Sequence, residues 1–250
     1  MTAGKKIYFN SDYHLGIPNA RQSRERELRV VRWLDSIKHD AEEIYLLGDL
    51  FDFWFEYQHV IPKGFVRLQG KIAELSDSGI RMHFFVGNHD LWVKNYFEEE
   101  LGLHIHRDNL RINCGSKRFF IHHGDGKGPN DKGYKRMKKV FTNPFFQWCF
   151  RWLHPDLGVG LAHFFSRRSS AKTRHKDAVF LGEDQEWLVQ YAKRKYSEEP
   201  ADFFVFGHRH LPLEIAINPD ATYINLGDWI SHFTYAEFDG EQLRLKRFEG

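Results

Sequence analysis

Five short apolar runs along the chain end in small groups of polar side chains. They are KIYFNSDYH (residues 6–14), EIYLLGDLFD (43–52), RMHFFVGNHD (81–90), KRFFIHHGD (117–125) and DFFVFGHRH (202–210). Continuous apolar runs bounded by turn residues are typical of strands that are buried on both faces. The sequence therefore predicts five buried strands, each of which delivers polar side chains at its carboxyl end.

Segments with helical periodicity separate several of these strands. They are RERELRVVRWLDSIKHD (24–40), VRLQGKIAELSDSG (66–79), with Gly79 as a C-terminal cap, and EDQEWLVQYAKRKYSEE (183–199). The final TYAEFDGEQLRLKRFE (234–249) predicts a hairpin that turns at Asp239-Gly240. Strands that alternate with helices indicate a layered α/β fold, in which ligands bind beyond the carboxyl ends of the strands. All five polar groups fall at such ends.

The composition fits a soluble globular protein that buries a core, because 42% of its 250 residues are hydrophobic and 28% are charged. The two cysteines, Cys114 and Cys149, lack Cys-x-x-Cys spacing. This argues against a disulfide framework or a thiolate zinc site and fits a reducing cytosol. The N-terminus lacks the apolar core of a signal peptide, and no stretch approaches the ~18–20 apolar residues that span a membrane. We expect a cytoplasmic protein that at most lies on a membrane.

The charge is unevenly distributed, although the formal net charge is only +2. Residues 127–176 hold 12 Lys/Arg and 2 Asp/Glu, a net charge of +10, and the remainder holds 24 basic and 32 acidic residues, a net charge of −8. The basic stretch also carries many rings: Phe141, Phe145, Phe146, Trp148, Trp152, Phe164 and Phe165. A basic, amphipathic, aromatic segment suits an anionic lipid surface, and the alternative is that the rings pack against the rest of the fold. No nucleic acid partner is expected, because the acidic bulk of the chain would oppose a long duplex.

Taken singly, each polar group has a simple structural interpretation. Gly48-Asp49 is a common turn, and Asn88 could cap the helix that follows it. Asp12 and His14 could form a hydrogen-bonded pair. Together, however, the groups supply aspartate, histidine and asparagine without cysteine, a ligand set that suits Mn, Fe, Zn or Ni. Seven candidate ligands are too many for one ion and suit two ions roughly 3.5–4 Å apart that share a carboxylate, the spacing used for displacement at phosphorus.

The motifs and their order resemble those of the calcineurin-like metallophosphoesterases. The matching motifs are Asp12-x-His14, Gly48-Asp49-x-x-Asp52, Gly87-Asn88-His89-Asp90, His123-Gly124-Asp125 and Gly207-His208-x-His210. The resemblance implies a β-sandwich flanked by helices, with a two-metal site at one end. We expect two divalent transition-metal ions, manganese first, with iron or zinc as alternatives.

The resemblance also assigns a role to each motif residue. It places the first metal on Asp12, His14, Asp49 and His210, and the second on Asp49, Asn88, His123 and His208, with Asp49 as the bridge. His89 would stabilise charge on the phosphate rather than bind metal, and Asp52 would orient His89. His122, beside His123, would be a structural residue. No serine or cysteine nucleophile is needed, because the cations activate water.

Residues 127–180 are expected to form a helical, basic, aromatic-rich insertion, the cap segment, within a single domain that spans residues 1–250. Together with YLLGDLFDFW (45–54), FFVGNHD (84–90) and HHGDGKGPNDKGYKRM (122–137), it is most similar to the UDP-2,3-diacylglucosamine hydrolases within the superfamily. This resemblance implies cleavage of the pyrophosphate of a nucleotide-linked glycolipid, UDP-2,3-diacylglucosamine, to UMP and 2,3-diacylglucosamine 1-phosphate in lipid A biosynthesis. It implies a peripheral place on the cytoplasmic face of the inner membrane, with no obligate protein partner.

Substrate contacts are expected from six residues. The resemblance implies Asn88, His89, Asp131 and Tyr134, and the RRSSAKTR stretch (167–174) adds Arg168 and Lys172 as cationic candidates. Two features depart from the pattern: His89 stands where some of these hydrolases have arginine, and NLGDWISH (225–232) differs from the Asn-Pro-Gly run common in the superfamily. Two alternatives remain. One is a metallophosphoesterase with a soluble nucleotide or phosphoester substrate, and the other is a non-catalytic scaffold.

Overall fold

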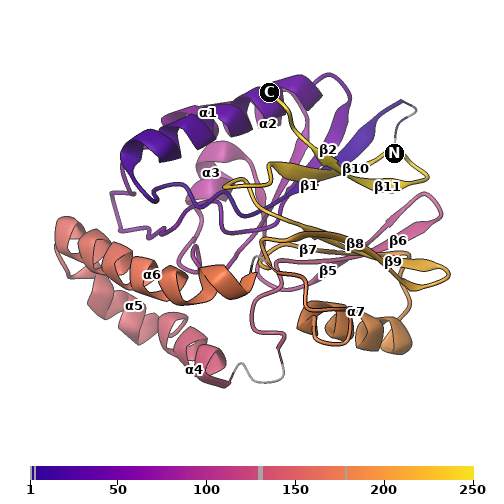
Figure 1. Cartoon of the computed structure of the whole chain (residues 1–250). Helices are drawn as coiled ribbons and strands as arrows, with labels where there is room; N and C mark the ends of the chain where they lie inside the picture. Colours follow the sequence, from indigo (N-terminus) through magenta and orange to yellow (C-terminus); the bar gives the residue numbers. More distant parts are fainter. Residues whose placement is uncertain (1, 3, 129–131, 178) are drawn as a thin grey trace.

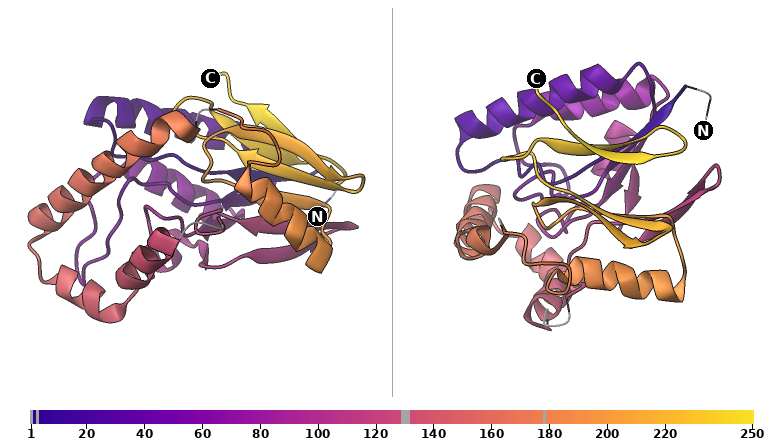
Figure 2. Two further views of the ribbon diagram at one scale, coloured as in Figure 1. Left: turned by 60° about the horizontal axis from the view of Figure 1, so that its bottom comes forward. Right: turned by 45° about the vertical axis from the view of Figure 1, so that its right-hand side comes forward.

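Two β-sheets pack face to face at the centre of the molecule, and helices cover both outer faces (Figures 1 and 2). The computed structural model describes residues 2, 4–128, 132–177 and 179–250, without the side chains of Lys132 and residues 167–177. The layers therefore run helix, sheet, sheet, helix. This arrangement confirms the predicted layered α/β fold, a β-sandwich flanked by helices.

The first sheet has parallel strands at its centre and an antiparallel pair at one edge. It contains β1 (Lys6–Asn10), β2 (Ala41–Leu46), β3 (Arg81–Phe85), β4 (His104–His106), β10 (Thr234–Phe238) and β11 (Leu243–Arg247). The strand order is β11-β10-β1-β2-β3-β4, with β1 to β4 mutually parallel. The carboxyl ends of β1, β2 and β3 therefore meet at one edge.

The second sheet repeats this plan with five strands. It contains β5 (Leu110–Cys114), β6 (Lys117–His122), β7 (Phe203–Phe206), β8 (Pro212–Asn218) and β9 (Ala221–Leu226), in the order β5-β6-β7-β9-β8. The three central strands β6, β7 and β9 are parallel, and antiparallel strands lie at both edges. Their carboxyl ends also share one edge, which is where the loops that carry His123, His208 and His210 begin.

Alternating side chains explain why the strands are buried on both faces. The helices are α1 (Ala20–Ile37), α2 (Val66–Asp77) and α3 (Tyr96–Leu101) over the first sheet and α7 (Trp187–Glu198) over the second. Tyr8 faces the first helical layer and packs edge-on against Trp33, with ring centroids 6.4 Å apart. Its neighbour Phe9 faces the other way and stacks on Phe119 across the sandwich, at 5.7 Å. Phe204 lies in the apolar cluster beneath α7.

The predicted elements are confirmed. The five apolar runs are β1, β2, β3, β6 and β7, the periodic segments are α1, α2 and α7, and the hairpin is β10-β11. Gly79 follows Ser78, the C-cap of α2, with a φ of +91°. The sequence did not predict β4, β5, β8, β9 or α3. Two of them show why: β4 is only 3 residues long, and β8 is a half-exposed edge strand with no continuous apolar run.

The cap segment contains three helices, α4 (Lys132–Phe141), α5 (Pro144–Arg151) and α6 (Pro155–Asp177). They lie beyond one end of the sandwich, at the left of Figure 1. Among the described residues, we find no helix with the length and apolarity needed to cross a membrane. Ser166 of α6 contacts Asp52 in the loop after β2, so the cap stands at the end where the polar loops leave the strands.

Candidate metal centre

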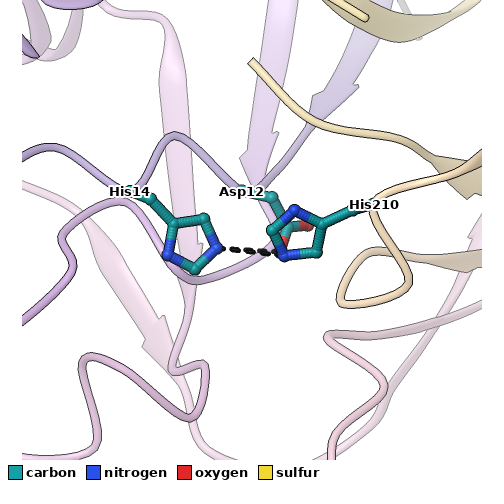
Figure 3. Close-up of side chains that lie close together, drawn as sticks. All are labelled: Asp12, His14 and His210. Carbon is teal, nitrogen blue, oxygen red and sulfur yellow. Dashed lines mark hydrogen bonds and ion pairs between the residues drawn. The ribbon is translucent and has the colours of Figure 1, made fainter. Parts of the chain in front are cut away.

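The loops that follow β1, β2 and β7 bring their polar side chains together at the cap end of the sandwich. His14 Nε2 lies 3.1 Å from His210 Nε2, 3.6 Å from Asp12 Oδ1 and 3.7 Å from Asp49 Oδ2. Figure 3 shows the two imidazole rings, each with a nitrogen turned toward the other, next to the Asp12 carboxylate. Asp12, His14 and His210 thus form one group that could hold a metal ion.

Asp49 joins this group to a second one. Its Oδ2 atom lies 3.7 Å from His14 Nε2 and 3.4 Å from His123 Nε2. Asp49, His123 and His208 form another possible metal group, and Asn88 Oδ1 lies 3.3 Å from His123 Nε2. The structure therefore brings together all seven residues that the sequence proposes as ligands, with Asp49 between the two groups.

The donor atoms fit metal ions better than they fit one another. Ligand atoms bound at about 2.1 Å to one ion lie about 3.0–3.4 Å apart, and the nitrogen and oxygen atoms of these groups have similar separations. Asp12 Oδ1 is buried without a hydrogen-bond partner among the described residues, and it lies 3.4 Å from His210 Nε2. A buried oxygen without a partner is costly, so a cation is a fitting occupant. Carboxylate and imidazole donors without thiolate suit manganese, iron or zinc.

Five of the seven proposed ligands have a left-handed backbone conformation. The φ angles are +58° at Asp12, +44° at His14, +53° at Asp49, +68° at His208 and +56° at His210. Non-glycine residues in such regions cost about 1–3 kcal/mol each and cluster at functional sites. Neighbouring glycines let the loops approach closely: a methyl group on Gly87 would collide with Asp49 Oδ1, and one on Gly207 would lie 2.7 Å from Asp12 Oδ2. The rest of the fold must stabilise these strained loops.

Hydrogen bonds on the far ring nitrogens orient two of the histidines. His123 donates its Nδ1–H to the carbonyl oxygen of Leu47 at 2.6 Å, so its Nε2 atom points into the site. His210 Nδ1 lies 3.4 Å from Asp228 Oδ2, and Asp228 Oδ1 accepts the backbone N–H groups of residues 230–232. Metal-binding histidines in proteins are typically fixed in this way.

Opposite charges dominate the electrostatics of the site. Burial lowers the pKa of His123, but the Asp49 carboxylate outweighs burial and raises this pKa to about 10. Burial and Asp12 compete in the same way at His210, whose pKa rises to about 9. Burial raises the pKa of Asp12, but the charge of His210 and a contact with His14 bring it down to about 2. Each imidazolium compensates a buried carboxylate, which is the charge that a divalent cation would also compensate.

His89 lies beside the two groups, and it also forms a possible metal group with His14 and Asp49. Its ring meets the His14 ring edge-on, with centroids 4.7 Å apart. Its Nδ1–H donates to the main-chain oxygen of Asp52 at 2.9 Å, and the Asp52 carboxylate lies 3.5 Å from the same nitrogen. Burial raises the pKa of Asp52, but a hydrogen bond from His163 and the charge of His89 leave it below its usual value. Asp52 thus holds one ring nitrogen of His89 and leaves the other for the site.

Tyr134 contacts the loops that carry the proposed metal ligands, here called the metal loops. The contact is made through Asp125 of the His-Gly-Asp motif. The Tyr134 hydroxyl donates to Asp125 Oδ2 at 2.6 Å, and Lys138 Nζ lies 2.6 Å from the same oxygen. Burial raises the pKa of Asp125, but the charges of His123 and Lys138 lower it well below its usual range. The other expected contacts in the cap segment lie outside the described part of the structure: Asp131, and the side chains of Arg168 and Lys172.

The rings of the cap segment divide into two sets. Phe150 packs on Phe55 and Trp92, with centroids 4.7 and 4.6 Å apart, and Phe141 meets Trp92 at 5.5 Å. Six other rings are exposed: Phe145 62%, Phe146 47%, Trp148 54%, Trp152 75%, Phe164 58% and Phe165 60%. Packing against the core therefore accounts for a minority of the aromatic residues in this segment.

Sequence reasoning gave no role to several residues that the structure places at the site. Asp228 follows β9, so it ends a strand as the five predicted groups do, and this signal could have identified it. His163 and Ser166 contact Asp52 from α6, and nothing local in the sequence marks them. His122 has the structural role that the sequence predicts, because its Nδ1 accepts the backbone N–H of Gly124 at 2.7 Å.

Comparison with known proteins supports this interpretation of the site. A family model for calcineurin-like phosphoesterases matches residues 5–212. The chain is 40% identical to the UDP-2,3-diacylglucosamine hydrolase of Porphyromonas gingivalis over 98% of both chains. It is 28% identical to the UDP-2,3-diacylglucosamine hydrolase of Histophilus somni, covering 90% of this chain and 92% of that one. A crystal structure of a Thermus thermophilus protein shares the fold, with a TM-score of 0.50, 11% identity and coverage of 98% and 99%.

Proposed function

This chain belongs to the calcineurin-like phosphoesterase family and is a metal-dependent hydrolase, and we propose that its substrate is UDP-2,3-diacylglucosamine. The products would be UMP and 2,3-diacylglucosamine 1-phosphate, in a step of lipid A biosynthesis. The observation that carries this proposal is the 40% identity to a UDP-2,3-diacylglucosamine hydrolase over 98% of both chains. A similarity that includes the cap segment as well as the metal loops supports a shared substrate and not only a shared chemistry.

Two divalent cations would occupy the two groups of ligands. Asp12, His14, Asp49 and His210 would hold the first, and Asp49, Asn88, His123 and His208 the second. When bound, the cations would polarise the phosphoryl group and supply the nucleophile from water at neutral pH. Manganese is our first choice, with iron or zinc next, because the donors are carboxylate, amide and imidazole groups.

His89 would act on the phosphate, and Asp52 would hold His89 in position. The Nδ1–H of His89 is held by the main-chain oxygen of Asp52, which leaves Nε2 to face the substrate. A donor at this position would stabilise the charge that develops on the phosphate oxygens and could pass a proton to the leaving group. Asn88, beside His123, would also contact the phosphate.

The cap segment would bind the lipid part of the substrate and the membrane that supplies it. Trp148 and Trp152 are 54% and 75% exposed, and tryptophan is favoured where apolar and wet surroundings meet. Exposed apolar side chains in such numbers typically mark an interaction surface. The net charge of +10 over residues 127–176 would add attraction to anionic headgroups, about 1 kcal/mol per basic residue. We therefore place the enzyme on the cytoplasmic face of the inner membrane.

Four residues of the cap segment are proposed to contact the substrate headgroup: Asp131, Tyr134, Arg168 and Lys172. Tyr134 supports this role by its position, since its hydroxyl already reaches Asp125 next to the His123 loop. Two cationic side chains on α6 would suit a pyrophosphate.

The test of this function compares two substrates under matched detergent and metal. UMP release from UDP-2,3-diacylglucosamine should be far faster than from UDP-N-acetylglucosamine, which lacks the long acyl chains. Each buried methylene is worth about 0.8 kcal/mol, so the chains hold ample binding energy, part of which can position the pyrophosphate. Trp148→Ala with Trp152→Ala should narrow the difference if these rings contact the chains.

Equal catalytic efficiencies on the two substrates would remove the lipid from the proposal. The chain would then be a metallophosphoesterase for a soluble nucleotide or phosphoester. An Asp49→Ala control, measured in the same assay, ensures that the UMP comes from this metal centre and not from a contaminating hydrolase.

A further inference from the structure

The carboxylate of Asp52 is shared between the catalytic core and the cap segment. On the core side, His89 Nδ1 lies 2.9 Å from the Asp52 main-chain oxygen and 3.5 Å from its Oδ1. On the cap side, the Ser166 hydroxyl donates to Oδ1 at 2.7 Å and His163 Nδ1 lies 3.4 Å from Oδ2. His89 on the core side and His163 and Ser166 on the cap side are more than 70 positions apart in the chain.

This shared carboxylate is sealed from solvent. Asp52 is 1% exposed, and its backbone N–H donates to the carbonyl oxygen of Leu15 at 2.9 Å. A methyl group placed on Gly16 would lie 3.6 Å from His163 Cε1 and 3.8 Å from Asp52 Cβ, so helix α6 is in close contact with the loop here. A buried carboxylate without its donors would be strongly destabilised. The cap helix therefore satisfies a charge in the loop after β2, and the same residue, Asp52, contacts the catalytic histidine from the loop after β3.

We propose that His163 and Ser166 are positioning residues for His89, so that docking of the cap segment and correct orientation of the catalytic histidine are one event. His163 and Ser166 hold the carboxylate of Asp52, and Asp52 in turn holds Nδ1 of His89. The proposal rests on the proposed function in one respect, that His89 acts on the phosphate. Its physical basis is that a displacement of about 1 Å in a catalytic group can cost about a hundredfold in rate.

A purely structural role of His163 is the competing explanation, and a matched pair of variants separates the two. His163→Asn places an amide N–H near the position of Nδ1, whereas His163→Leu has similar bulk and no donor. A role limited to packing would treat the two alike or favour Leu. If His163 positions His89 through Asp52, His163→Asn should keep the His89 orientation and the activity that His163→Leu loses. His154→Ala, at an exposed histidine of the cap segment whose ring lies near Asp156, controls for a general disturbance of the cap.

The first measurement does not depend on the substrate. In protein labelled with nitrogen-15 at histidine and stripped of metal, the ring signal of His89 is assigned by its loss in His89→Ala. His163→Leu should shift this signal, and His163→Asn and His154→Ala should leave it in place. This readout stays valid even if UDP-2,3-diacylglucosamine is not the natural substrate.

The second measurement is manganese-dependent hydrolysis of bis(p-nitrophenyl) phosphate, with metal content measured in the same samples. His89→Ala should lose about 10²–10³ in kcat. His163→Leu should lose about tenfold to a hundredfold in kcat, with KM little changed and both metal ions retained. His163→Asn should recover most of this loss.

Ser166→Ala removes one hydrogen bond and should lose about threefold to tenfold in kcat. Asp52→Asn combined with His163→Leu should be no worse than Asp52→Asn alone, because the two act through one contact.

Three outcomes would overturn the proposal. An unchanged His89 signal together with an unchanged kcat in His163→Leu would make the contact incidental. Equal losses in the Leu and Asn variants with an unmoved His89 signal would leave only packing. Additive losses in the Asp52 double variant would mean that His163 acts independently of Asp52.

Discussion

The metal loops and the cap segment lie side by side. They depart in opposite ways from the usual distribution of side chains, in which charged groups are exposed and apolar groups are buried. In the loops, charged side chains are buried: Asp12, Asp49 and His123 are at most 1% exposed. In the cap segment, large apolar side chains are exposed, and Trp152 reaches 75%. Soluble proteins typically hide apolar groups and expose charged ones, so a buried charge or an exposed apolar patch is the informative observation.

The difference between the two regions indicates which partner suits each one. The loops hold carboxylates and imidazoles at ligand spacing, which suits cations. The cap segment holds exposed rings and basic residues, which suit the lipid partner that we propose for it. An enzyme that hydrolyses a pyrophosphate attached to a diacylated sugar needs both properties next to each other.

The largest effect is expected where the two metal groups meet. Asp49 Oδ2 lies within 3.7 Å of both His14 Nε2 and His123 Nε2, so Asp49→Ala should weaken both metal sites at once. We expect the metal content to fall from two ions per chain to near zero and hydrolysis to fall by at least about a thousandfold. Elemental analysis after gel filtration measures the metal, and circular dichroism checks the fold.

Asp228→Ala is the matched control for this prediction. Asp228 contacts His210 Nδ1 from outside the ligand set, so its loss should weaken metal affinity by only about 10–100-fold. If Asp49→Ala kept one ion at the affinity of the unmodified protein, Asp49 would serve a single metal and the bridging assignment would be wrong.

Much of the metal centre follows from the sequence because its signals are local. Asp49 and His123 each sit directly after a buried strand, and parallel strands bring such ends to one edge. Asp228 has the same position after β9, but the sequence predicts no strand over β9, so Asp228 receives no role from it. His163 could not be predicted, because its contact with Asp52 depends on how α6 packs over the loops. That packing is a tertiary property that no local pattern encodes.

A smaller effect is expected from pH, and it concerns the loops alone. His123 and His210 have pKa values raised to about 10 and about 9 by Asp49 and Asp12, so both rings are protonated at pH 7. A metal ion binds only the deprotonated ring and must displace this proton. Apparent affinity should therefore rise with pH by about tenfold per unit for each ion between pH 7 and the respective pKa, and level off above it.

Isothermal titration with manganese in buffers of different ionisation enthalpy measures both the affinity and the protons released. Binding of the cap segment to anionic vesicles should show no comparable rise, because its net charge of +10 comes from 12 lysine and arginine residues against 2 acidic ones in residues 127–176. Manganese affinity that is flat from pH 7 to pH 9 would mean that the two histidines are neutral before the metal binds.

The smallest effect compares two adjacent lysines that belong to different regions. Lys138 reaches back to the buried Asp125 of the metal loops at 2.6 Å, whereas Lys139 is exposed on the cap segment. Lys139→Gln should weaken binding to vesicles that contain phosphatidylglycerol by about fivefold, since one basic residue near an anionic surface contributes about 1 kcal/mol. The hydrolysis of bis(p-nitrophenyl) phosphate by Lys139→Gln should not change.

Lys138→Gln should lower that hydrolysis, because it removes the partner of a buried carboxylate next to the His123 loop. The boundary between the two regions would then lie between neighbouring side chains of α4. If both variants affected only vesicle binding, Lys138 would belong to the lipid surface and its contact with Asp125 would not support the metal loops.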